Sequence, residues 1–74
     1  MSSNTELSVV EALDQAISVF GSQQELAKKL GDGYSQQKIS YWRNVGRIPA
    51  EHAVVLERVT GVSKRLLCPM VFQE

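Results

Sequence analysis

The chain has 74 residues, 43% hydrophobic and 22% charged, and its eight basic and eight acidic residues cancel. This length favours a single small domain, residues 1–74, near the lower size limit for a stable core. The composition excludes a disordered chain, and no apolar run reaches the roughly 20 residues that span a bilayer. Because the start, MSSNTELSVV, also lacks a signal-peptide pattern, we expect a cytoplasmic protein that does not enter the membrane.

The charge is distributed unevenly along the sequence. Residues 1–27 contain acidic side chains and no basic one, whereas residues 28–47 contain basic side chains against the single acidic residue Asp32. The basic group consists of Lys28, Lys29, Lys38, Arg43 and Arg47. Local fields matter more than the total charge for binding an anionic partner. Charge alone leaves two interpretations open, a surface for nucleic acid and an ordinary solvated surface.

The first segment with helical periodicity is LSVVEALDQAISVF, residues 7–20. Its apolar residues recur at a spacing that places them on one face. We expect Asn4 or Thr5 to cap its start and Gly21 to end it. The predicted inward row is Leu7, Val10, Leu13, Ile17 and Phe20.

A second, shorter helix is predicted in SQQELAKKLG, residues 22–31. Ser22 and Glu25 have the spacing of a capping box, in which each side chain bonds the backbone N–H of the other residue. The predicted inward face consists of Leu26, Ala27 and Leu30.

The connection GDGY, residues 31–34, predicts a tight turn with positive backbone dihedrals at its glycines. Ser35 then begins a third helix, SQQKISYWRN. Ile39 and Trp42 lie three residues apart, so we expect both to face inward. The outer face is polar, and it is basic toward its C-terminal end.

The last third of the chain predicts one more full helix and a short turn of helix. Pro49 suits the first turn of PAEHAVVLERVTG, whose inner row is Ala53, Leu56 and Val59. Ser63 can cap the single turn SKRLL, and the tail MVFQE predicts a short extended end. The fold class is therefore all-α, a compact bundle of about five short helices.

The second and third helices, joined by a glycine-containing turn, form a helix-turn-helix unit. In such a unit the N-terminal part of the second helix reaches base edges in the major groove, and the first helix crosses the DNA backbone. We expect base contacts from Gln36, Gln37, Ser40 and Tyr41. The expected backbone contacts are Ser22, Gln23, Ser35, Lys38, Arg43 and Arg47. Tyr41 could equally cover the edge of the core.

The sequence gives little support for catalysis or for a metal or cofactor site. His52 stands alone near a helix start, which favours an ordinary surface histidine, and Cys68 favours a small core residue or a bystander. We expect no catalytic set, no metal site and no cofactor. Apolar residues that could serve either a dimer interface or intramolecular packing are Val54, Val55, Val71 and Phe72.

Three stretches together resemble a known family: FGSQQELAKKLG, SQQKISYW and GRIPAEHAVVLERVTGVS. They are similar to the Cro-like phage repressors and the related YdaS-type antitoxin-like regulators of the lambda-repressor-like fold, over about residues 9–68. The resemblance implies base contacts by Gln36, Gln37 and Ser40, a backbone contact by Gln23, and a dimer on a two-fold operator.

Two features depart from the family pattern. The turn GDGYS is two residues longer, which could tilt the reading helix or bring the N–H groups of Asp32 and Gly33 to a phosphate. The tail CPMVFQE also differs.

The hypothesis favoured by these patterns is a sequence-specific regulator of transcription that binds double-stranded DNA as a homodimer, a Cro-like prophage repressor. Two alternatives remain open. One is an antitoxin-like regulator that also binds a toxin or another protein partner. The other is a helical interaction module that does not bind DNA.

Overall fold

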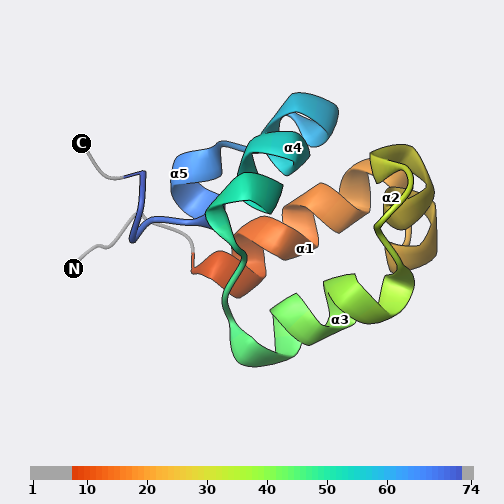
Figure 1. The fold of residues 1–74 in the computed structure, drawn as a ribbon, viewed down its shortest axis with the longest axis horizontal. Coiled ribbons are helices and arrows are strands. Elements are labelled where there is room, and N and C mark those ends of the chain that lie inside the picture. The colour runs from red at the N-terminus through yellow and green to blue at the C-terminus, as the bar shows by residue number, and fades with distance from the viewer. Residues whose placement is uncertain (1–7, 73–74) are drawn as a thin grey trace.

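Residues 8–72 are described in a computed structural model of the chain, and within this range the fold is all-α (Figure 1). The helices are α1 (Val9–Phe20), α2 (Gln23–Leu30), α3 (Gln36–Val45), α4 (Ala50–Thr60) and α5 (Lys64–Leu67). No strand occurs between residues 8 and 72. The predicted bundle of five short helices is confirmed.

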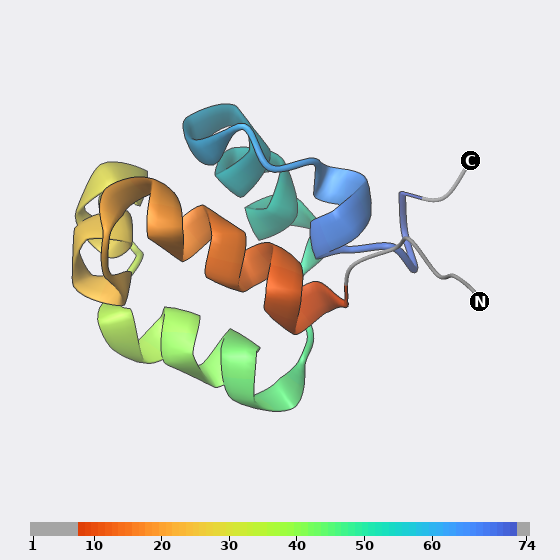
Figure 2. The same cartoon turned by 180° about the vertical axis from the view of Figure 1, so that it is seen from behind.

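Helix α1 runs through the middle of the molecule. Helices α3 and α4 lie on opposite sides of it, α2 closes one end, and α5 packs against α1 and α4 near the other end (Figures 1 and 2). Every helix therefore contacts α1, which gives the small chain one shared core. The fully buried larger side chains come from all five helices: Leu13, Leu26, Ile39, Leu56 and Leu67.

Small residues set the packing face of α1. The predicted inward residue Leu13 is fully buried, but its buried neighbours are Ala12 and Ala16, whereas Ile17 and Phe20 are half-buried at the margin. Alanines allow neighbouring helices to approach closely, so the apolar row predicted from larger side chains is displaced toward them. The predicted member Leu7 lies outside the described residues.

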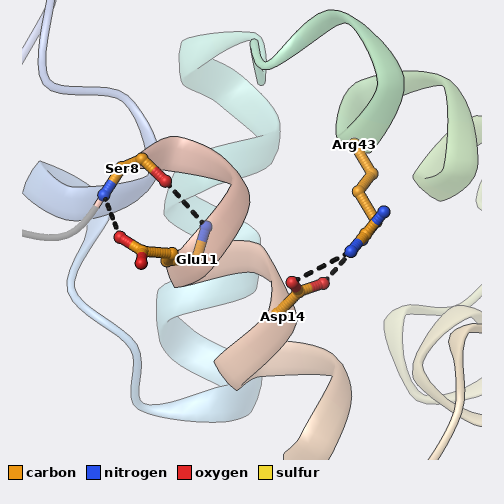
Figure 3. Close-up of polar contacts among 4 residues, drawn as sticks. All are labelled: Ser8, Glu11, Asp14 and Arg43. Atoms are coloured by element: carbon orange, nitrogen blue, oxygen red, sulfur yellow. Dashed lines mark hydrogen bonds and ion pairs between the residues drawn. The ribbon is translucent and has the colours of Figure 1, made fainter.

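The start of α1 differs from the prediction. Asn4 and Thr5 lie outside the described residues, and the cap is Ser8, whose Oγ accepts a hydrogen bond from the N–H of Glu11 at 3.1 Å. The carboxylate of Glu11 in turn accepts from the N–H of Ser8 at 2.9 Å (Figure 3). This capping box satisfies two backbone donors and fixes where the helix begins.

The capping box predicted for α2 forms only in part. Ser22 Oγ accepts from the N–H of Glu25 at 3.1 Å, but the return bond that completes the box in α1 is not formed here. Instead, the Glu25 carboxylate lies 3.5 Å from Lys28 Nζ. Because Lys28 lies one turn along the helix, the exposed carboxylate of Glu25 has an alternative partner to the backbone N–H of Ser22. This explains why the capping box remains half formed.

The tail prediction was wrong within the described residues. The N–H groups of Val71 and Phe72 both donate to the carbonyl of Cys68, at 3.2 and 3.1 Å, so residues 69–72 turn instead of extending. The turn packs the half-buried Phe72 against the core, and Lys64 Nζ lies 4.9 Å from the centre of its ring. Burial of the ring favours the turn over an extended end.

Candidate nucleic-acid interface

Helices α2 and α3 pack against each other and are joined by residues 31–35, which is the predicted helix-turn-helix arrangement (Figure 1). Gly31 and Gly33 have φ values of +98° and +91°, so the predicted positive dihedrals are confirmed. Lys38 Nζ reaches back from α3 and donates to the Gly33 carbonyl at 2.8 Å. The longer turn is therefore held by α3 itself.

The N-terminal half of α3 presents polar side chains on a fixed helix. Ile39 and Trp42 are buried, as predicted, and they orient the helix on the core. On the outer face, Gln36 and Gln37 are exposed in the first turn, and Tyr41 follows one turn later with 64% of its surface exposed. Because the side chain of Tyr41 is so exposed, it does not serve as a cover for the core.

Both helices of the unit begin with a serine cap. Ser35 Oγ accepts from the N–H of Lys38 at 3.1 Å, as Ser22 does at the start of α2. A hydroxyl oxygen that accepts this bond keeps its own hydrogen free to donate. The helix N-termini add backbone N–H groups and a partial positive charge. Ser22, Ser35 and the half-buried Gln23 thus lie at ends that favour anions.

Arg43 has an internal partner that the sequence did not reveal. Its Nε donates to Asp14 Oδ1 at 2.7 Å and its Nη2 to Asp14 Oδ2 at 3.1 Å, which ties α3 to α1 (Figure 3). The hydrogen bond from Arg43 lowers the pKa of the Asp14 carboxyl below its usual value of 3.8, and the same bond raises the pKa of Arg43. Both side chains remain partly exposed, so the guanidinium stays at the surface.

The aromatic residue in the turn belongs to a cluster that the sequence analysis missed. Tyr34 Oη lies 2.9 Å from His52 Nδ1, and the rings of Tyr34, Trp42 and His52 contact one another. The interpretation of His52 as an ordinary surface histidine was wrong, since its side chain is only 20% exposed. The available signal was Tyr34 itself, one large ring in a turn of small and polar residues.

At the C-terminal end of α3 lies an open groove with a volume of about 820 Å³. Tyr41 and Val45 contribute from α3, and Met70 and Val71 contribute from the tail. The buried ring of Trp42 also lines the groove. The remaining lining residues are Arg47, Pro49, Ala50 and Cys68. Of the four predicted dimer residues, Val71 lines this groove, whereas Val54 and Val55 are half-buried on α4 and Phe72 packs on the core.

Between residues 8 and 72, no cluster of three or more His, Cys, Asp or Glu side chains could hold a metal ion. In the same range no helix has the length and apolar character that crossing a membrane requires.

Comparisons with known proteins agree with this architecture. A sequence model of the family "Bacterial toxin YdaS" matches residues 13–74, so the chain belongs to that family. Among solved structures, the chain is similar to the Cro protein from Xfaso 1, an element assigned to a prophage in Xylella fastidiosa strain Ann-1. The two are 46% identical with a TM-score of 0.77, over 85% of this chain and 97% of the other. A comparison with curated protein sequences gives no match.

Proposed function

We propose that this member of the YdaS family is a Cro-like regulator of transcription that binds double-stranded DNA in a sequence-specific manner. The observation that carries the proposal is the first turn of α3, where two exposed glutamines stand on a helix anchored by buried Ile39 and Trp42. Similarity to a Cro protein across most of both chains supports it. The protein acts by occupying its operator and performs no chemistry of its own.

Gln36 and Gln37 are the proposed readers of base edges. A glutamine amide can donate to N7 of adenine and accept from its N6 amino group at the same time, which distinguishes this base from others in the major groove. Ser40 and Tyr41, one turn further along α3, would reach neighbouring positions. The buried side of the helix limits its rotation, so the same side chains are presented to each site.

The proposed backbone contacts divide into neutral and charged donors. Ser22, Gln23 and Ser35 lie at the starts of α2 and α3 and would donate to phosphate oxygens. Lys38 and Arg47 would supply positive charge near the reading helix, and their phosphate contacts would release counterions. Arg43 is shared, since Asp14 already holds its guanidinium and a phosphate would have to compete for it.

We further propose that a second copy of the chain occupies the groove at the end of α3. Tyr41 and Val45 belong to the reading helix itself, so a two-fold contact through this groove fixes both reading helices relative to each other. The exposed side chains Met70 and Val71, which also line the groove, supply further apolar area. Such a dimer requires an operator with two symmetric half-sites.

A second candidate function follows from the family description, which names a toxin. The sequence-based alternative was an antitoxin-like regulator with a protein partner, and the family description instead favours a chain that inhibits growth when produced alone. Growth of cells after induction separates the two. Arrest by the wild type but not by Gln36→Ala would link toxicity to DNA binding, whereas arrest by both would point to a different target.

The test of the main proposal is selection of bound duplexes from a random DNA library near physiological salt, with α3 unaltered. We expect an enriched motif with two-fold symmetry, whose half-site spacing reports the arrangement of the dimer. Weak, salt-sensitive binding without enrichment would overturn sequence-specific recognition, since phosphate contacts alone give binding of that kind.

A further inference from the structure

Three aromatic rings connect the turn, the reading helix and α4. Tyr34 and Trp42 meet edge to face with ring centres 6.3 Å apart, and Tyr34 and His52 meet in the same way at 5.2 Å. The His52 ring lies against the Trp42 indole at 5.2 Å with an angle of 32° between their planes. Pairs of this geometry add to the stability that burial provides.

The polar atoms of the cluster indicate which groups donate. Glu51 Oε2 lies 3.5 Å from Nε2 of His52, and the negative charge of this exposed carboxylate favours a proton on the nearer ring nitrogen. It therefore favours the tautomer of His52 that carries its proton on Nε2. Nδ1 is then the acceptor of the 2.9 Å bond, and the Tyr34 hydroxyl donates. A neighbouring carboxylate commonly sets the histidine tautomer in this way.

We propose that the Tyr34–His52 hydrogen bond fixes the orientation of α3 on the core and is thereby a determinant of base specificity. Tyr34 directly precedes the cap Ser35, so its position sets where the first turn of α3 begins. The bond joins that position to α4, and the shared contact with Trp42 joins it to the C-terminal half of α3. Tyr34 and His52 are positioning residues, which act through Gln36 and Gln37.

This role accounts for the longer turn. An added turn segment without an anchor would let the start of α3 shift, and small displacements of reading side chains weaken base contacts. Here the turn supplies its own anchor, because Tyr34 carries the hydroxyl and ring that dock on α4. The part of the proposal that concerns specificity rests on the proposed DNA binding, but the part that concerns helix orientation does not.

The orientation is tested without DNA by NMR on the whole chain. We compare wild type, Tyr34→Phe and His52→Phe, both of which keep a ring in place. In the wild type the ring ¹⁵N shifts of neutral His52 should report protonated Nε2 and acceptor Nδ1. In Tyr34→Phe residual dipolar couplings along α3 should change relative to those along α4. Unchanged couplings in both variants would overturn the positioning role, whatever the protein binds.

Specificity is tested with the library selection and with competition by random duplex. We expect each variant to lose about two- to tenfold of the preference for the enriched motif over random DNA, the range of one net hydrogen bond. The double variant should lose no more than either single one, since both remove the same bond. Val59→Ala, in the half-buried row of α4, is the control for lost stability and should keep the preference.

The outcomes separate the two proposals. Failure of the wild type to enrich a motif contradicts the proposed function, and the NMR comparison still decides the positioning role. A wild-type motif that both variants retain at full preference contradicts the specificity role while leaving DNA binding in place. Additive losses in the double variant would show that the two residues act separately and would also overturn the proposal.

Discussion

Asp14 and Arg43 show how one residue pair can link the scaffold to the reading helix. Asp14 lies on α1 and Arg43 on α3, and their two-point contact joins the helices at the molecular surface. The Asp14 carboxylate holds the Arg43 guanidinium, which would otherwise be available to a phosphate. Under the proposed DNA binding, Asp14 and a phosphate would compete for Arg43, so Asp14 would affect DNA affinity as well as stability.

The pair predicts a specific dependence of stability on pH. The folded-state pKa of Asp14 lies below its ordinary value of 3.8, so its contribution is fully present above that pH and is lost as pH falls through the folded pKa. In Asp14→Asn the free energy of unfolding should be lower than in the wild type at neutral pH, and the difference should vanish in strong acid. Urea unfolding across this range measures it.

Arg43→Gln is the matched variant, because it breaks the same pair from the other side. In Arg43→Gln the free energy of unfolding should lose the same dependence on acid pH as in Asp14→Asn. If the wild type and either variant still differ in free energy of unfolding below the folded pKa of Asp14, the ion pair is not the source of that difference.

Gln36 is the residue at which base reading is most directly tested. Gln36→Ala should relax the preference at one position of each half-site by about 1–3 kcal/mol, since it removes a bidentate contact. Selection from the random library gives the position and size of the change. Gln15→Ala, an exposed glutamine on α1, is the control and should leave the motif intact. An identical motif in wild type and Gln36→Ala would remove this residue from the interface.

At the scale of elements, the turn between α2 and α3 depends on glycine. Gly33 has a φ of +91°, and a Cβ placed there would meet no atom within 4 Å. The cost of Gly33→Ala therefore comes from the backbone conformation alone, which we expect to be about 1–2 kcal/mol. Thermal unfolding measures it. Gly33→Asn should recover part of the loss, because asparagine tolerates this region, and an unchanged stability in Gly33→Ala would contradict the assignment.

The elements themselves were predictable from local signals. Serines at 22, 35 and 63 and glycines at 21, 31 and 61 mark the helix ends, because their effects on caps and backbone are local. Partners distant in sequence were not predictable in this way. Asp14 and Arg43 are 29 residues apart, and Tyr34 and His52 are 18 apart, so their contacts depend on how the helices pack.

The site was predictable to a similar degree. The exposed glutamines and the buried Trp42 follow from the periodicity of α3, because the two faces of one helix are related by its geometry. The groove residues Val45 and Met70 were missed, since an exposed apolar side chain shows no distinctive sequence pattern. The roles of the site residues in DNA binding remain predictions.

At the scale of the whole molecule, the groove leads to a prediction about assembly. Val71→Asp places a charge in the proposed dimer contact and should weaken self-association about tenfold or more. Sedimentation of the free protein and of the protein on the enriched duplex measures this. Val19→Asp changes a similarly exposed valine on α1 and is the control. Unaltered assembly in Val71→Asp would place the dimer contact on another surface.

The measurement that tests the central claim most directly is a scan of the enriched duplex with 7-deazapurines, which lack the N7 acceptor in the major groove. Substitution at one purine of each half-site should weaken binding of the wild type about tenfold and leave Gln36→Ala or Gln37→Ala unaffected at that position. This result would join a glutamine of α3 to a defined base edge. Equal binding of the wild type to every substituted duplex would contradict the account, because no side chain of α3 would then read the major groove through N7.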